Sequence, residues 1–190
     1  MSSPSTEYNG LIFAETFGDL AYTMYSHAIS LRDLGCTQSP MNAWITLTGV
    51  ETLPLRMERH CSNGLVVAEF LEKHKNVEWV SHAGLKSSKF HKLGKKYFPN
   101  GTGSLFAFGV KGGYESGLKL LESVELFSHV ANLGDTRSLI LHPASTTHRQ
   151  LTEEQRIAAS AGQEVVRISV GIECAEDLIV DLDQALNILS

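Results

Sequence analysis

The sequence has few cysteines, and none of them are paired at the spacing of a metal knuckle or a redox dithiol. Cys36, Cys61 and Cys174 lie far apart and are odd in number, so a disulfide framework is not indicated. We therefore expect three reduced thiols in a cytosolic protein. We also expect each thiol to act mainly as a small apolar side chain.

Long apolar runs and basic stretches are missing as well. No apolar run approaches the roughly 20 residues that a membrane span needs, and the polar start, MSSPSTEYNG, has no signal-peptide core. The net charge is −5, from 16 basic and 21 acidic residues, and no basic face favours nucleic acid. With 43% hydrophobic and 19% charged residues, the composition is that of a soluble globular domain binding neither membranes nor nucleic acids.

The first 75 residues have the spacing of helices and no strand pattern. Apolar residues recur at helical intervals over 15–34, and Gly35 follows as a helix-ending residue. Ser39 and Pro40 have the pattern of an N-cap and a first helical position. A long helix is predicted over 51–76, where Gly64 would cost about 1 kcal/mol relative to alanine. We therefore expect Gly64 to mark close packing against another element.

The remainder alternates strands with helices, which predicts an α/β or α+β layer. Thr152 and Gln155 form a capping box for a short helix, and an amphipathic helix is expected over 175–189. Gly112 and Gly113 have the pattern of a turn after a strand, not of a phosphate loop. Strands are expected within the segments VEWVS (77–81), GSLFAFGV (103–110), LFSHVAN (126–132), SLILH (138–142) and EVVRISVG (164–171).

The segment HPASTTHRQL, residues 142–151, is the first candidate for chemistry. His142 and His148 are six residues apart with no further ligand nearby, which disfavours a metal site. Ser145 lies between the histidines but lacks the glycines of a nucleophile elbow, which disfavours a hydrolase. The loop hydroxyls could instead donate hydrogen bonds to a small anion.

Arg167 is the second candidate because it interrupts an apolar strand. A buried arginine needs a partner, and its fork matches a carboxylate in two parallel hydrogen bonds. Asn132 could contribute at the same anion. Alternatively, Arg167 lies at an exposed sheet edge or pairs with an internal acid such as Asp135. The residues alone favour a small-anion contact over a metal, and they leave these alternatives open.

Several segments resemble the pyridoxal-phosphate enzymes of sulfur amino-acid metabolism, nearest to the O-acetylhomoserine sulfhydrylase branch. They are SPMNAWITLTGVETLPLRMERH, VEWVSHAGL, FAFGVKGG, LFSHVANLGD and the tail from HPASTTH through VVRISVG. The resemblance runs from about Tyr8 to Leu186. It implies the C-terminal domain of a fold-type I enzyme, a small sheet with helices on one face, preceded by long connecting helices. Residues 1–75 would end the large domain and connect the domains, and 76–190 would form the substrate-carboxylate domain.

The resemblance also implies roles for three residues. Arg167 would hold the substrate's α-carboxylate, Asn132 would contact the same group, and Thr147 would lie close by. The HPASTTH loop would then shape a carboxylate pocket for an amino-acid substrate, with no metal.

The cofactor implied is pyridoxal 5′-phosphate, but this chain departs from the family pattern. None of its nine lysines lies in an S-x-T-K-type stretch that would form the Schiff base, so we assign it no catalytic or cofactor-binding residue. Relatives are about twice as long. We expect either the C-terminal portion of an enzyme, acting in a homo-oligomer or with a missing N-terminal half, or a truncated, inactive paralogue that serves as an interaction module.

Overall fold

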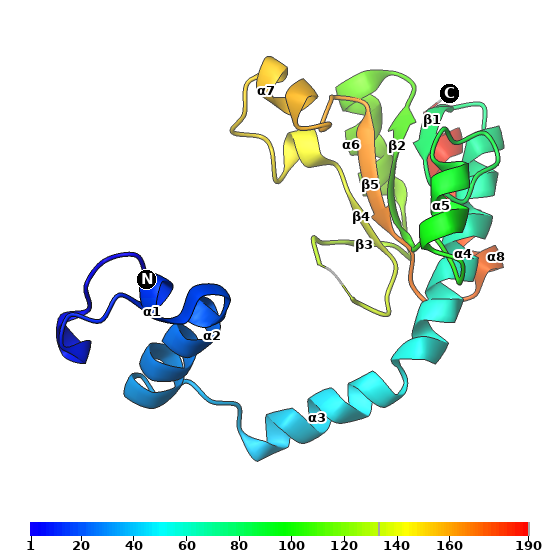
Figure 1. Ribbon diagram of the computed structural model, residues 1–190. Helices are drawn as coiled ribbons and strands as arrows, with labels where there is room; N and C mark the ends of the chain where they lie inside the picture. Colours follow the sequence, from blue (N-terminus) through cyan, green and yellow to red (C-terminus); the bar gives the residue numbers. More distant parts are fainter. Residues whose placement is uncertain (133, 190) are drawn as a thin grey trace. The chain divides into compact units, whose positions relative to one another are not determined.

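The computed structural model describes residues 1–132 and 134–189 (Figure 1). The chain divides into two compact units, residues 1–51 and residues 52–190. The division falls after the first residue of the long helix expected over 51–76, and the helix observed there, residues 53–73, belongs to the second unit. The proposed domain division after residue 75 stays a prediction. In the described part of the chain, no helix is both long and apolar enough to cross a membrane.

The first unit is helical, but the single helix predicted over 15–34 is segmented. Gly18 has a φ of 49°, a conformation that interrupts a regular helix, and residues 26–33 form a π-helical turn. Gly35, with a φ of 70°, follows the last turn as predicted. The elements are η1 (Thr6–Tyr8), α1 (Phe13–Phe17), η2 (Gly18–Leu20), α2 (Ala21–Tyr25), η3 (Ser26–Asp33) and α3 (Pro40–Glu51).

The second unit is built on a five-stranded mixed sheet. Its strand order is β1-β2-β5-β4-β3, and every pairing is antiparallel except that of β3 with β4. All five predicted strands are present, although each is shorter than its predicted segment or equal to it. The strands are β1 (Val77–Ser81), β2 (Leu105–Val110), β3 (Ser128–His129), β4 (Leu139–Leu141) and β5 (Val165–Ser169).

Three helices of this unit cover one face of the sheet (Figure 1). The side chains of Phe108, Ile168 and Leu182 meet there with no exposed surface, and burial of each such side chain stabilises the fold by about 1.5–3 kcal/mol. The covering helices are α4 (Leu53–Lys73), α6 (Gly113–Ser123) and α8 (Ala175–Asn187); shorter helices are α5 (His91–Tyr97), η4 (Pro143–Ser145) and α7 (Glu153–Ala158). The Thr152–Gln155 capping box is confirmed at the start of α7.

The opposite side, which we call the open face, receives the alternate side chains of the same strands. Phe106 and Phe108 point to the helices, so Ala107 between them points away. The register places Ala107 opposite Arg167 and Gly109 opposite Trp79. The open face is formed by Trp79, Ser81, Leu105, Ala107, Gly109, Leu139, Leu141, Val165, Arg167 and Ser169.

Helix α4 is fixed to the end of β5 by buried polar side chains. Asn63 donates from Nδ2 to the carbonyl oxygens of Gly171 and Glu173 at 3.0 and 2.8 Å. Gly64 lies on the same side of α4, where a Cβ atom would come within 2.9 Å of the Gly103 oxygen and Ser104 Cα. The close packing predicted at Gly64 is therefore confirmed.

The cysteines are all free, but only Cys61 fits the expected role of an apolar filler. Cys61 is half-buried, whereas Cys36 and Cys174 are exposed. The expectation was wrong for these two, because each lies in a loop between helices or strands where no core surrounds it.

Candidate carboxylate-binding site

Arg167 lies in the middle of the second unit's sheet. It belongs to β5, which has β2 on one side and β4 on the other, so the alternative of an exposed sheet edge is wrong. Its cross-strand neighbours on the open face are Ala107 and Leu141. Both are apolar, and neither can accept a hydrogen bond from a guanidinium through its side chain.

Asp135, the acid considered as an internal partner, is engaged elsewhere. Its carboxylate pairs with Arg137, with 2.9 Å between Nη2 and Oδ2, and it also accepts from the Arg137 backbone N–H. These hydrogen bonds hold the pKa of Asp135 well below its ordinary value. Within residues 1–132 and 134–189, the Arg167 guanidinium has no hydrogen-bonding or ionic partner. Arg167 is half-buried, so the open face presents a cation that could bind an anion.

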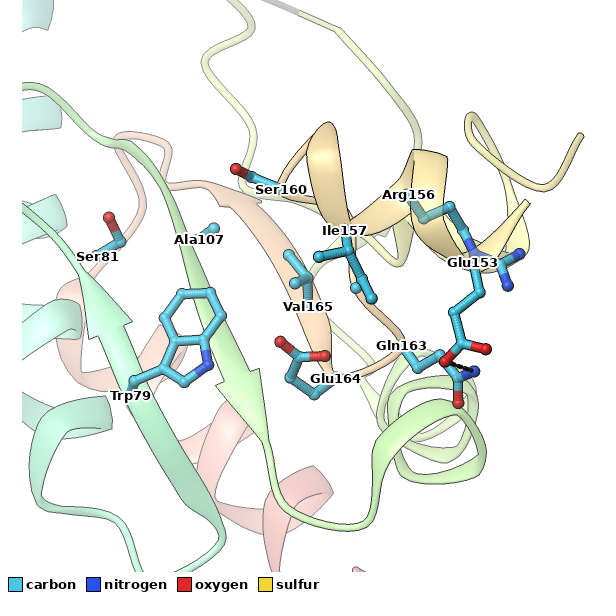
Figure 2. Close-up of a pocket in the computed structure, with 11 residues that line it drawn as sticks. Trp79, Ser81, Ala107, Glu153, Arg156, Ile157, Ser160, Gln163, Glu164 and Val165 are labelled. Atoms are coloured by element: carbon cyan, nitrogen blue, oxygen red, sulfur yellow. Dashed lines mark hydrogen bonds between the residues drawn. The ribbon is translucent and has the colours of Figure 1, made fainter. Parts of the chain in front are cut away.

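Each cross-strand neighbour of Arg167 lines a hollow, although Arg167 itself is not among the residues that line either one. Ala107 belongs to the larger hollow, about 740 Å³, which is bounded by the sheet and α7. Figure 2 shows Ala107 and Val165 on its floor, with Trp79 and Ile157 on opposite sides. Leu141 belongs to the second hollow, about 570 Å³, between the β3 end and the HPASTTH loop. The two hollows therefore lie beside the strands that pair with β5 on either side of Arg167.

The second hollow brings together the segments that carry Asn132 and Thr147. Thr147 lines it together with Leu141 and Ala131, the residue before Asn132. Asn132 donates from Nδ2 to Asp135 Oδ2 at 3.3 Å, and the Thr147 hydroxyl is 2.8 Å from His148 Nδ1. Both side chains are exposed. The described contacts do not join either side chain to Arg167, so their roles in binding remain proposals.

The HPASTTH loop is held by His142, whose two ring nitrogens both have partners. Nε2 lies 2.8 Å from the Gln163 carbonyl oxygen and Nδ1 lies 3.0 Å from Ser145 Oγ. The Thr146 hydroxyl donates back to the His142 carbonyl at 2.7 Å. Burial lowers the pKa of His142, which keeps the imidazole neutral near pH 7. His142 thus positions the loop. In the described part of the chain, no group of three His, Cys, Asp or Glu residues is arranged to hold a metal.

The lysines of the chain lie on its surface, and all nine are exposed. Lys111, in the turn after β2, donates from Nζ to the Lys75 carbonyl oxygen. The exposed residues are Lys73, Lys75, Lys86, Lys89, Lys92, Lys95, Lys96, Lys111 and Lys119.

Sequence reasoning missed the residues that support β5. His60 is buried on α4, with Nδ1 2.7 Å from the Val170 carbonyl oxygen, and Asn63 lies one turn further on. Glu173 accepts from the Ser138 N–H and hydroxyl at 2.7 and 3.0 Å, joining the β5 end to β4. The signal was available, since His60 and Asn63 are polar residues within the buried side of an amphipathic helix.

The fold is that of a known class of enzymes. Residues 5–187 match the family model described as Cys/Met metabolism PLP-dependent enzyme. The chain therefore belongs to the family of pyridoxal-phosphate-dependent enzymes of cysteine and methionine metabolism.

Particular relatives narrow the similarity to one branch of that family. The chain is 45% identical to a homocysteine synthase of Schizosaccharomyces pombe over 98% of its length, and 47% identical to an O-acetyl-L-homoserine sulfhydrylase of Leptospira meyeri over 97%. A crystal structure of a protein assigned as an O-acetylhomoserine (thiol)-lyase from Campylobacter jejuni, containing a pyridoxyl-lysine phosphate, matches 98% of the chain at 40% identity with a TM-score of 0.84. The chain spans 44% of the length of each of these proteins.

Proposed function

We propose that this chain supplies the substrate α-carboxylate site of a cytosolic, pyridoxal-phosphate-dependent enzyme that adds sulfide or a thiol to an O-acylhomoserine. The observation that carries the proposal is Arg167, a half-buried guanidinium on the middle strand with no partner among the described residues. A carboxylate can accept two parallel hydrogen bonds from such a fork. The relatives named as O-acetylhomoserine sulfhydrylase and homocysteine synthase support this choice of substrate.

The roles of the described residues in this function concern binding and orientation. Arg167 would fix the carboxylate end of the amino acid, and Asn132 and Thr147 would bound the pocket from the second hollow. Holding one end of a substrate in a fixed orientation lowers the entropic part of the barrier for the reaction at its other end. The described lysines are exposed and do not fit a Schiff-base role, so the cofactor site would come from the part of the enzyme that this chain does not match.

The direct test pairs this chain with the complementary part of the Leptospira meyeri relative and measures sulfide-dependent acetate release from O-acetyl-L-homoserine. We expect Arg167→Ala to raise the KM for the ester roughly 10- to 100-fold, because a charge-assisted hydrogen-bonded contact contributes about 1.5–3 kcal/mol. Arg167→Lys should recover part of the loss, since it keeps the charge but not the fork.

The matched control is Arg32→Ala, which removes an exposed arginine from the first unit. It should leave the KM unchanged. If Arg167→Ala and Arg32→Ala have the same KM as the original chain, Arg167 does not hold the substrate carboxylate.

A second function, that of a non-catalytic interaction module, is favoured by the exposure of all nine lysines. Treating the chain with pyridoxal phosphate and then with borohydride distinguishes the interaction module from the enzyme. An interaction module should carry no stoichiometric adduct at a single lysine of this chain, and it should not restore sulfide-dependent acetate release when it is mixed with the complementary part. An active reconstituted enzyme should carry one adduct, on the complementary part.

A further inference from the structure

The hollow between the sheet and α7 has an aromatic wall opposite an aliphatic one. Trp79 on β1 and Ile157 on α7 lie on its two sides, and Ala107 and Val165 form the floor (Figure 2). Its volume is about 740 Å³. Every residue that lines it belongs to the second unit, so its shape does not depend on where the first unit lies. A concave space of this size with apolar walls is the usual form of a small-molecule site.

Two glycines make room for the side chains that give this hollow its chemistry. At Gly109, a Cβ atom would lie 2.3 Å from Trp79 Nε1, so the indole lies directly against β2. At Gly162, a Cβ atom would lie 2.5 Å from Glu164 Oε2, so the carboxylate lies over the loop that leads into β5. Neither glycine has a positive φ, so the backbone conformation does not require glycine there. At both positions, glycine supplies space for a side chain that lines the hollow.

The Glu164 carboxylate has no counter-ion in the described part of the chain. Glu164 is half-buried, and its backbone is fixed because its carbonyl oxygen accepts from the Val110 N–H at 2.9 Å. Figure 2 shows the carboxylate between Trp79 and Ile157. Among the described residues, no hydrogen bond or ion pair reaches its two oxygen atoms. A partly buried carboxylate is most stable beside a cation, so this end of the hollow is suited to a positively charged group.

The arginine of the same hollow does not supply that positive charge. Arg156 on α7 lines the hollow, but no ion pair of the described residues joins it to Glu164. Figure 2 shows its side chain directed toward Glu153, at the end of the hollow away from Trp79. Glu153 also accepts from Gln163 Nε2 at 3.3 Å. The hollow therefore has two carboxylates and one guanidinium, and its Trp79 end is anionic.

We propose that this hollow is a binding site for an organic ammonium ion that carries an aromatic or apolar group. The ammonium group donates to the Glu164 carboxylate and lies against the Trp79 ring, while the apolar group lies between Trp79 and Ile157. A charge-assisted hydrogen bond and a cation–π contact both favour an ammonium over a neutral group of the same shape. This hollow is separate from the one that Thr147 lines, and the proposal does not depend on the substrate-carboxylate site.

The probe is phenethylammonium, titrated into the full chain by isothermal calorimetry. We expect saturable binding of one ion per chain. Phenethyl alcohol, which is neutral, should bind at least tenfold more weakly, and the hydrocinnamate anion more weakly still. The anion tests the other end of the hollow, because Arg156 Nε is buried and has no hydrogen-bond partner in the described part of the chain. If phenethylammonium does not saturate the chain, or if the anion binds more tightly, the proposal is wrong.

Two glutamates of the hollow provide a matched pair of variants. Glu164→Gln keeps the size of the side chain and removes its charge, so the Kd for phenethylammonium should rise at least tenfold. Glu153→Gln removes the same charge from the end near Arg156 and should change the Kd less than threefold. Equal changes would show that the ion responds only to the total charge of the hollow, and the contact with Glu164 would be excluded.

Two substitutions of Trp79 test the aromatic wall. Trp79→Leu should raise the Kd for phenethylammonium about fivefold or more, and Trp79→Phe should raise it less because a ring remains. Urea unfolding of both variants comes first, and the phenylalanine variant stays informative if the leucine variant is unstable. If both bind like the original chain, the indole makes no contact with the ion.

A last titration adds the complementary part of the Leptospira meyeri relative. Phenethylammonium should bind to the mixture as it does to the chain alone. Its displacement would show that a side chain of the complementary part occupies the hollow, and the proposal of a ligand site would fail. These titrations do not use acetate release, so failure here and failure of the Arg167 site are distinguishable.

Discussion

His60 Nδ1 lies 2.7 Å from the carbonyl oxygen of Val170, which joins α4 to the residue immediately after β5. A carbonyl can only accept, so Nδ1 carries the proton and the imidazole is held in one tautomer or as the cation. Together with Asn63, this contact holds the end of the strand that carries Arg167. The position of the arginine on the open face therefore depends on a helix on the opposite side of the sheet.

The first prediction concerns Asn63, which is 2% exposed and donates two hydrogen bonds to the segment after β5. Asn63→Ala leaves two carbonyls without their donor, so we expect the free energy of unfolding to fall by about 2–3 kcal/mol in urea denaturation. Ser62→Ala, at the neighbouring exposed position, should change it by about 0.5 kcal/mol or less. Equal effects of the two substitutions would show that the Asn63 hydrogen bonds do not contribute to the free energy of unfolding.

A second prediction compares two helical glycines with opposite expectations. Alanine is about 1 kcal/mol better than glycine within a helix, and at Gly49 the added Cβ would meet nothing within 4 Å. Gly49→Ala should therefore increase helicity measured by circular dichroism. Gly64→Ala should instead destabilise the second unit by about 1–3 kcal/mol, because its Cβ would lie 2.9 Å from the backbone at Gly103 and Ser104.

The measurement for both glycines is urea unfolding of the full chain followed by circular dichroism. If Gly64→Ala is stabilising, helix propensity outweighs packing at that position, and α4 can move away from residues 103–104 at little cost.

Asp181 provides the third prediction because it closes the turn between α6 and β3. Its buried carboxylate accepts from the backbone N–H groups of Glu125, Leu126 and Phe127 at 2.8–3.1 Å. Asp181→Ala leaves three donors unpaired in a buried site, and we expect a loss of about 3 kcal/mol or more in the free energy of unfolding. Asp177→Ala, on the exposed first turn of the same helix, should cost about 1 kcal/mol at most. A loss at Asp181 as small as that at Asp177 would contradict the role assigned to this carboxylate.

The fourth prediction is a pH dependence that arises from His142. Burial lowers its pKa in the folded chain below the ordinary value of about 6.5. Protonation therefore favours the unfolded state: the contribution to stability is complete above about pH 6.5 and is lost as the pH falls through the folded pKa. We expect urea midpoints to decrease between pH 7.5 and pH 5, and the decrease to be smaller in His142→Gln. An identical decrease in both proteins would assign the effect to other groups.

The local features of this fold could be predicted from sequence more readily than its long-range arrangement. The capping box at Thr152 and the turn at Gly112 depend on neighbouring residues, and both are present in the structure. The helix over 15–34 was predicted as continuous because its apolar spacing is regular. That spacing does not show the φ of 49° at Gly18 or the π-helical turn after Tyr25.

Arg167 shows the same limit at the candidate site. Its apolar neighbours in sequence predicted a strand, but an edge position and a middle position have the same local pattern. The order β2-β5-β4 depends on pairings between residues about 25 to 65 positions apart, and the pairing of Asp135 with Arg137 removed the expected internal partner. Neither the strand order nor the Asp135–Arg137 pair can be predicted from the residues next to Arg167 in the sequence.

The chain has two tryptophans, and they fall in different compact units. Trp44 is on α3, whereas Trp79 lies so close over Gly109 that a Cβ there would be 2.3 Å from the indole Nε1. Each unit thus carries one native fluorophore. If Trp44 is replaced with phenylalanine, the remaining tryptophan emission reports on the open face. If Trp79 is replaced, the remaining emission reports on α3. The two surfaces can therefore be followed separately by intrinsic fluorescence, without an attached dye.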